Sequence, residues 1–240
     1  MMGFDRPLKP EWIYKTLKMI EPGKKPSDYY KPFDETIAVE RIGKHGTRKI
    51  RTILFRTFVY SFQDQKSTIE NNLLIELSKA HDIKFMKPVF LAKLTMDYEI
   101  LWFLTQKIQQ LFDPYQEINS SVISKKMTGQ FGDTEIVKRS TRSFFKTLSS
   151  FGILEPISTT RYHQIPKTAL NEEQVKFILK LYADTYHTRQ IDIKNFDNLI
   201  FAYHQQPVLS KVALAFHNQE WEYIRGMNRE LLLLKCGSRN

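Results

Sequence analysis

The sequence has one cysteine, Cys236, among its 240 residues. A single cysteine cannot form an internal disulfide or a cysteine metal cage, which favours a reducing compartment. The first ten residues lack the apolar core of a secretory signal. The most apolar region, residues 85–104, is interrupted by charged side chains that are costly in a bilayer centre. We therefore expect a cytoplasmic protein without a membrane partner.

Motifs of the commoner enzyme classes are missing as well. The six histidines share no metal-ligand spacing with one another or with the cysteine. There is no glycine-rich phosphate loop, serine elbow or metalloprotease helix motif. Asp133, Glu135 and Lys138 are similar to the acidic–acidic–lysine sites of metal-dependent nucleases, but their spacing is poor and no supporting strand is expected. The sequence favours a non-enzymatic protein without cofactor, metal or small-molecule substrate.

The charge is strongly basic. A formal net charge of +10 and a pI near 9.5 favour an acidic polymer or surface as partner, most commonly nucleic acid. Composition does not separate DNA from RNA or from anionic lipid. With 42% hydrophobic and 13% aromatic residues the chain is typical of a folded protein, so the charge belongs to a structured surface. We expect a mostly helical, multi-lobed protein with three parts: 1–112, 113–168 and 169–240.

The best-specified local structure is predicted at residues 133–156. Asp133 or Thr134 can cap a helix at its start, and Gly152 stands where a C-terminal cap is expected. Apolar side chains recur at i, i+4, i+7, i+8 and i+11, as on the core face of a helix. This predicted core face consists of Val137, Thr141, Phe144, Phe145, Leu148 and Phe151.

The neighbours of this helix complete a recognisable layout. Residues 117–127 read as another short helix, 128–132 as a turn, and 153–165 as a small hairpin. This order predicts a winged helix-turn-helix, in which the second helix enters the major groove and the hairpin touches the backbone. The alternative is a surface helix whose charges are merely solvated. The DNA contacts predicted here are Lys138, Arg139, Arg142, Lys146 and Arg161.

A second basic cluster precedes a predicted buried helix at residues 50–62, with Thr47 as its cap. Side chains and free backbone N–H groups at such a helix start could bind phosphate. The alternative is again a set of solvated charges at the end of a buried helix. The cations of this cluster that we expect to contact DNA are Lys44, Arg48, Lys49 and Arg51.

Most of the remaining chain is predicted to be helical, apart from a proline-rich loop at residues 21–34. Helices are expected at residues 9–20, 68–80, 89–94 and 95–111, the second of them with a capping box formed by Ser67 and Glu70.

The last third of the chain is expected to form a second winged unit or a capping subdomain. Asn171 and Gln174 predict a capped helix that reaches to about residue 186. Further helices are expected at 193–203 and 207–217, followed at 221–235 by a hairpin in preference to a helix. The third of these helices carries only Lys211 as a clear cation, which poorly supports DNA reading there.

Three segments carry a resemblance to a known family: GTRKIRTILFRTFV at 46–59, LLIELSKAHDIKFMKPVFLAKLTMDYEILWFLTQKI at 73–108 and STRSFFKTLSSFGIL at 140–154. Their layout resembles the BrxA family of bacterial BREX phage-defence systems. The resemblance implies a helical region similar to the antitermination factor NusB, joined to a winged-helix-like part. It also implies binding of double-stranded DNA without known catalytic activity.

This resemblance covers residues 9–156 and rests on order and apolar pattern. Residues from 171 onward do not match, and the proline-rich stretch at 21–34 departs from the family pattern. By position, the start of the family's basic helix corresponds here to Ser140, Thr141 and Arg142.

Together these patterns predict a non-enzymatic protein that binds double-stranded DNA within an anti-phage (antiviral) defence system. Other proteins of that system are further candidate partners. One alternative is a scaffold that binds a protein partner, and another is a transcription regulator, which would need the same basic helix. A metal-dependent nuclease is the third choice.

Overall fold

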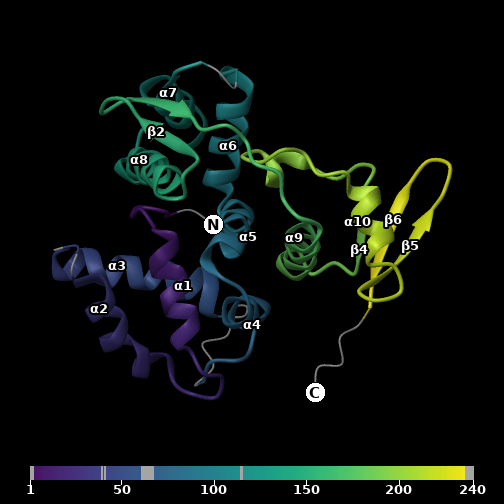
Figure 1. The fold of residues 1–240 in the computed structure, drawn as a ribbon. Coiled ribbons are helices and arrows are strands. Elements are labelled where there is room, and N and C mark those ends of the chain that lie inside the picture. Colours follow the sequence, from purple (N-terminus) through teal and green to yellow (C-terminus); the bar gives the residue numbers. More distant parts are fainter. Residues whose placement is uncertain (1–2, 39, 41, 61–67, 114–115, 236–240) are drawn as a thin grey trace. The chain divides into compact units, whose positions relative to one another are not determined.

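The computed structural model describes residues 3–38, 40, 42–60, 68–113 and 116–235, and the described chain is mostly helical (Figure 1). It divides into two compact units, Met1–Pro166 and Lys167–Asn240. The division falls two residues before the boundary predicted after residue 168. The regions predicted at 1–112 and 113–168 both lie in the first unit.

The first part of unit 1 is a helical bundle. Helix α1 packs on α2, α4 and α5, and it buries Trp12, Ile13 and Leu17, as its periodicity predicts. The helices of this part are α1 (Pro10–Met19), the 3-10 turn η1 (Pro26–Tyr29), α2 (Tyr30–Ala38), α3 (Lys44–Leu54), the π-helical turn η2 (Phe55–Val59), α4 (Leu73–Ala80), α5 (Ile83–Asp97) and α6 (Glu99–Leu111).

The predicted loop at residues 21–34 is wrong in its second half, where η1 and α2 form. Pro26 opens η1 and Pro32 lies in the first turn of α2, where a missing N–H removes no helical hydrogen bond. Phe33 and Ile37 fill the core from α2. The prediction treated Pro26 and Pro32 as residues that end a helix, whereas both lie at the start of one.

Several predicted helix starts also differ from the structure. Helix α3 begins at Lys44 after Gly43, so Thr47 lies inside the helix rather than capping it. Helix α4 begins at Leu73, because the side chain of Asn72 accepts a hydrogen bond from the Ile75 N–H at 2.9 Å. The predicted capping residue Ser67 and the end of the helix predicted to reach residue 62 lie outside the described residues.

The two helices predicted to meet at Thr95 meet instead at Tyr98. Asp82 caps α5 by accepting from the Phe85 N–H at 2.8 Å, and the helix then runs through Pro88 to Asp97. The side chain of Tyr98 is fully buried. Both helices are therefore real, and only their boundaries were misplaced.

The second part of unit 1 is a winged helix-turn-helix, as predicted. Helix α6 packs on α7 and α8, and three antiparallel strands pair in the order β1-β3-β2. Strand β1 was not predicted, and α7 starts later and ends later than residues 117–127. The elements that follow α6 are β1 (Ile118–Asn119), α7 (Ser120–Phe131), α8 (Glu135–Ser150), β2 (Leu154–Pro156) and β3 (Arg161–Gln164).

Unit 2 repeats this order of elements. Its strands pair in the order β4-β6-β5, the counterpart of β1-β3-β2, so its topology is that of a second winged unit. The hairpin predicted at 221–235 is confirmed, whereas the helix predicted at 193–203 is reduced to one 3-10 turn. The elements are α9 (Glu172–Thr185), β4 (Gln190–Asp192), η3 (Asn198–Phe201), α10 (Leu209–Ala215), β5 (Trp221–Arg225) and β6 (Glu230–Leu234).

The core of unit 2 centres on Trp221. Its side chain is fully buried, and its indole Nε1–H donates to the Ala213 carbonyl of α10 at 2.9 Å. The predicted capping box is confirmed, since Asn171 and Gln174 each accept a hydrogen bond from the backbone N–H of the other. Within the described ranges, no helix combines the length and apolar character needed to cross a membrane.

Candidate nucleic-acid interface

Helix α8 is held in place by its ends and its buried side. The Thr134 side chain accepts from the Val137 N–H at 3.4 Å, and Gly152 takes a φ of 75°, a conformation that favours glycine. Every member of the predicted core face is buried: Val137, Thr141, Phe144, Phe145, Leu148 and Phe151. The rotation of α8 about its axis is therefore fixed by packing.

The opposite face of α8 presents cations to solvent. Arg139, Arg142 and Lys146 are exposed, with 48% of the Arg139 side chain and 67% of the Arg142 side chain accessible. Their spacing of three and four residues aligns them along one side of the helix. The predicted placement of these three cations is confirmed, and their contact with DNA stays a prediction.

Two carboxylates lie at the start of α8, Asp133 just before its cap and Glu135 as its first residue. Glu135 lies 3.4 Å from Arg139 Nε and 3.8 Å from Arg142 Nη2. Asp133 lies 2.6 Å from Lys138 Nζ, and this hydrogen bond raises the pKa of Lys138. All of these groups are solvent-exposed, where ion pairs contribute little and compete poorly with other anions. The arginines are thus oriented by Glu135 but remain available.

Further along α8, Lys146 differs from the two arginines. Within the described ranges no carboxylate lies at ion-pair distance from its ammonium group. It is therefore the cation on this face that a phosphate would meet with the least competition.

The wing is the hairpin formed by β2 and β3. Its tip, residues 157–160, is exposed, and the Ile157 N–H donates to the Arg161 carbonyl at 2.9 Å. The Thr160 carbonyl accepts from both the N–H and the Oγ of Ser120, at 2.8 and 3.0 Å, which ties the wing to the start of α7. The Arg161 side chain is 61% exposed and lies 3.6 Å from Glu117.

Helix α7 adds two cations that were not singled out in the sequence. Lys125 and Lys126 are exposed, while Ile123 and Met127 of the same helix are buried against the unit. Both lysines lie within the helix predicted at 117–127, to which no DNA contact was assigned.

The second basic cluster lies on α3, and its members are not equivalent. Lys44 and Arg48 are exposed and one helical turn apart. The Lys49 ammonium pairs with Asp5 at 2.7 Å. Arg51 is only 16% exposed; its Nη1 lies 2.6 Å from both carboxylate oxygens of Asp34. Because α3 begins at Lys44, this lysine alone among the four cations lies in its first turn.

The guanidinium of Arg51 has a second contact inside the bundle. It lies over the Tyr30 ring, 4.3 Å from the ring centroid. A guanidinium held by a carboxylate and an aromatic face stabilises the fold. Of the predicted contacts Arg51 is therefore the most engaged in packing, and Lys44 and Arg48 are the most accessible of this cluster.

An N-terminal segment, residues 3–8, connects the two basic regions within unit 1. Phe4 packs edge-on against Phe144 of α8 at 6.3 Å, and the Leu8 N–H donates to the Thr147 Oγ1 at 3.0 Å. The same segment reaches α3 through the ion pair between Asp5 and Lys49. Figure 1 shows this segment between the two helices. The N-terminal segment is thus in contact with both α3 and α8, the helices that carry the two basic clusters.

The nuclease-like combination of Asp133, Glu135 and Lys138 is arranged as surface ion pairs. Asp133 forms an ion pair with Lys138, and Glu135 forms ion pairs with the two arginines, so the two carboxylates have different partners. Across the described part of the chain, no three His, Cys, Asp or Glu side chains gather in a way that could hold a metal ion. This geometry gives no support to a metal-dependent reaction at α8.

Comparison of the chain with protein-family models, with curated proteins and with solved structures finds no match. The charges and geometry of the chain's own residues are therefore the features that bear on its function. Those features are a firmly packed helix with a cationic face, a tethered wing and a second cationic helix in the same unit.

Proposed function

We propose that unit 1 binds double-stranded DNA, with α8 in the major groove and the wing on the backbone, and that it does so without catalysis. The observation that carries this proposal is that α8 has one buried side and one exposed, cationic side. Its core face is buried, so its other side, which carries the cations and the exposed Ile136, faces outward in the helix-turn-helix position that is typical of DNA reading.

Most of the affinity is expected from phosphate contacts. Arg139, Arg142, Lys146 and Arg161 would displace counterions from the DNA, which makes binding steeply dependent on salt. Phosphate oxygens would replace Glu135 as the partner of an arginine, at small cost because the existing pairs are exposed. Sequence preference is expected to be modest, unless one arginine forms a two-pronged contact with guanine.

The cations of α3 and α7 extend this surface. Lys44 and Arg48 lie beyond the N-terminal segment, and Lys125 and Lys126 lie on the helix that packs against α8. A duplex lying along unit 1 would meet several of these side chains in turn. They are expected to position the DNA rather than to read its sequence.

The biological context we propose is a bacterial anti-phage defence system of the BREX type, in the cytoplasm. The support for this is the resemblance of residues 9–156 to the BrxA family, in which a helical region is joined to a winged part. A transcription regulator would use the same helix, so the context is separate from the proposal of DNA binding.

A second candidate function is a scaffold for a protein partner, and unit 2 favours it. In the helix and wing positions of that unit the exposed side chains include large apolar ones: Val208 is 65%, Leu214 63% and Met227 99% exposed. Exposed apolar groups that gather on one surface are typical of protein contacts.

The experiment that tests DNA binding is a titration of labelled duplex with the full chain across a salt series. The test variant is Arg139→Ala/Arg142→Ala/Lys146→Ala. Its matched control is Lys211→Ala/Arg225→Ala/Arg229→Ala, which removes the same charge from the helix and wing of unit 2. We expect the first variant to lose at least about tenfold in affinity and about two units of salt slope.

The control variant is expected to bind within about twofold of the unchanged chain. Circular dichroism and thermal unfolding of both variants check that they fold. Equal losses in the two variants would show that net charge rather than the α8 face carries binding. Absence of binding at low salt would refute the proposal and leave the scaffold.

A further inference from the structure

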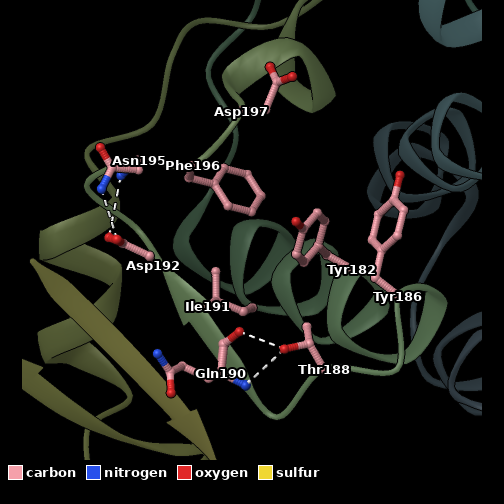
Figure 2. A pocket seen from close by; sticks show the side chains of 9 residues that line it. All are labelled: Tyr182, Tyr186, Thr188, Gln190, Ile191, Asp192, Asn195, Phe196 and Asp197. Atoms are coloured by element: carbon pink, nitrogen blue, oxygen red, sulfur yellow. Dashed lines mark hydrogen bonds between the residues drawn. The ribbon is translucent and has the colours of Figure 1, made fainter.

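Unit 2 contains a cavity of about 360 Å³ that the proposed DNA contact does not use. It lies where the C-terminal end of α9, strand β4 and the turn before η3 meet (Figure 2). This volume is enough for a small organic group. The residues that line it are Tyr182, Tyr186, Thr188, Gln190, Ile191, Asp192, Asn195, Phe196 and Asp197.

Three aromatic rings form one side of this cavity. Tyr182 and Tyr186 are one turn apart near the end of α9, and their ring centroids are 4.6 Å apart at an angle of 52°. The ring of Phe196 meets Tyr182 from the other chain segment, at 4.9 Å and 62°. Figure 2 shows the three rings next to one another. Rings tilted in this way present faces in several directions, and an aromatic face carries negative potential.

The charged part of the lining is acidic. Asp192 accepts hydrogen bonds from the Asn195 Nδ2 at 2.8 Å and the Lys194 N–H at 3.1 Å. The hydrogen bond from Asn195 lowers the pKa of Asp192, which keeps its carboxylate ionised. Asp197 accepts from the Leu199 N–H at 2.9 Å. None of the residues that line the cavity is Lys, Arg or His.

The end of helix α9 adds to this negative field. The 14-residue helix ends beside the cavity, and His187 leaves it with a φ of 51°. The C-terminal end of a helix carries a partial negative charge that favours nearby cations. Aromatic faces, two carboxylates and a helix C-terminus therefore all favour the same sign of ligand.

We propose that this cavity binds a small organic cation, a methylated ammonium or guanidinium group, against the sides of Tyr182, Tyr186 and Phe196 that line it. Asp192 and Asp197, whose carboxylates are hydrogen-bonded to Asn195 and to the Leu199 N–H, add negative charge at the edge of the cavity without having to contact the ligand. A phosphate or nucleotide would be repelled by the carboxylates, and a neutral apolar ligand would gain nothing from them. The cation is either a free small molecule or the side chain of a partner protein, and both present the same chemistry to the cavity.

The test compares choline with its neutral isostere 3,3-dimethylbutan-1-ol, which has the same shape without the charge. Each is titrated into the full chain, and binding is followed by NMR shifts of Ile191 and of the tyrosine rings. We expect choline to bind at least about tenfold more tightly than the isostere. Equal binding of the two, or no choline binding at tens of millimolar, would overturn the proposal.

Three variants separate the contributions of ring and carboxylate. Tyr186→Leu should weaken choline binding by about fivefold or more, whereas Tyr186→Phe keeps the ring and should keep the affinity. Asp197→Asn retains a side-chain oxygen for the Leu199 N–H and should reduce the preference for choline over the isostere. If Tyr186→Phe weakens binding as much as Tyr186→Leu, the hydroxyl rather than the ring holds the ligand, which contradicts the proposal.

The source of the cation is settled by a second pair of ligands. Free trimethyllysine and a ten-residue peptide with trimethyllysine at its centre are titrated in the same way. Tighter binding of the peptide supports a partner-protein side chain, and equal binding supports a free small molecule. Either result supports a cation site, and failure of both ligands would overturn it. Because these readouts lie in unit 2, they are independent of the outcome for DNA.

Discussion

Helices α8 and α10 occupy the same place in two copies of one topology. Each follows a helix, a strand and a second helix or helical turn, and each precedes two strands that pair in the same order. Yet α8 has 16 residues and an outward face of Arg and Lys, whereas α10 has seven residues, exposes Leu214 and is preceded by the exposed Val208. The fold alone therefore does not decide the partner; the exposed side chains do.

The one clear cation of α10 strengthens this contrast. Lys211 lies 2.9 Å from Glu172, so its charge is paired at the start of α9. On α8, by contrast, Glu135 is shared between two arginines, which leaves positive charge in excess. This difference is why we propose an anionic partner for one winged unit and an apolar or cationic partner for the other.

The largest effect that should distinguish the two units is the response of unit 2 to acid. His204 is 8% exposed, and burial, with a smaller effect from the nearby charge of Lys167, lowers its pKa from 6.5 to about 4. The unfolded chain binds a proton on His204 below pH 6.5, while the folded chain resists it until about pH 4. Stability is therefore full above pH 6.5 and falls as the pH drops towards 4.

Between pH 7 and pH 5 this difference amounts to about 2 kcal/mol. Amide hydrogen exchange of α9 measures the free energy of unfolding of unit 2 at both values. His204→Phe should remove most of the dependence. A chain whose α9 exchanges with equal protection at pH 5 and pH 7, after correction for intrinsic rates, would contradict this account of His204.

The next effect tests whether charge separates the two helices. Val208→Arg/Leu214→Arg places exposed cations at the start of α10 and near its end, and the full chain should then bind duplex DNA about three- to tenfold more tightly, with a salt slope larger by about one. Val208→Gln/Leu214→Gln is the neutral control. If the arginines add nothing, the short length of α10 rather than its lack of charge keeps it from DNA.

The smallest expected effect concerns Glu135. Glu135→Gln removes the carboxylate that faces Arg139 and Arg142, so we expect about threefold tighter DNA binding at low salt and a smaller gain at high salt. Glu222→Gln, an exposed carboxylate of unit 2, is the control for net charge. A gain of the same size in both variants would mean that Glu135 does not compete with DNA.

Local pattern predicted α8 well because everything that defines it lies within two dozen residues. The Thr134 cap, the buried face and Gly152 all follow from spacing along one helix. Strand β1 was missed because it has two residues and owes its existence to pairing with Tyr162, more than forty residues away. A two-residue strand is too short to show the alternation of apolar and polar residues by which strands are recognised, and its distant partner leaves no local signal.

The charges of the α3 cluster show the same limit. The sequence indicated a group of cations near Lys44, but it did not reveal that Arg51 faces Asp34 or that Lys49 faces Asp5. Both carboxylates come from segments distant in the chain. The cavity of unit 2 was not predicted either, since Phe196 joins the two tyrosines only through the turn after β4.

The most direct measurement of the central claim is amide hydrogen exchange of the full chain with and without a duplex of about 20 base pairs. The account predicts added protection in the first turns of α8 and in the wing at residues 157–161, and none in α10 or the loop between β5 and β6. Protection confined to α10 and that loop would contradict it, because the apolar winged unit would then be the one that meets DNA.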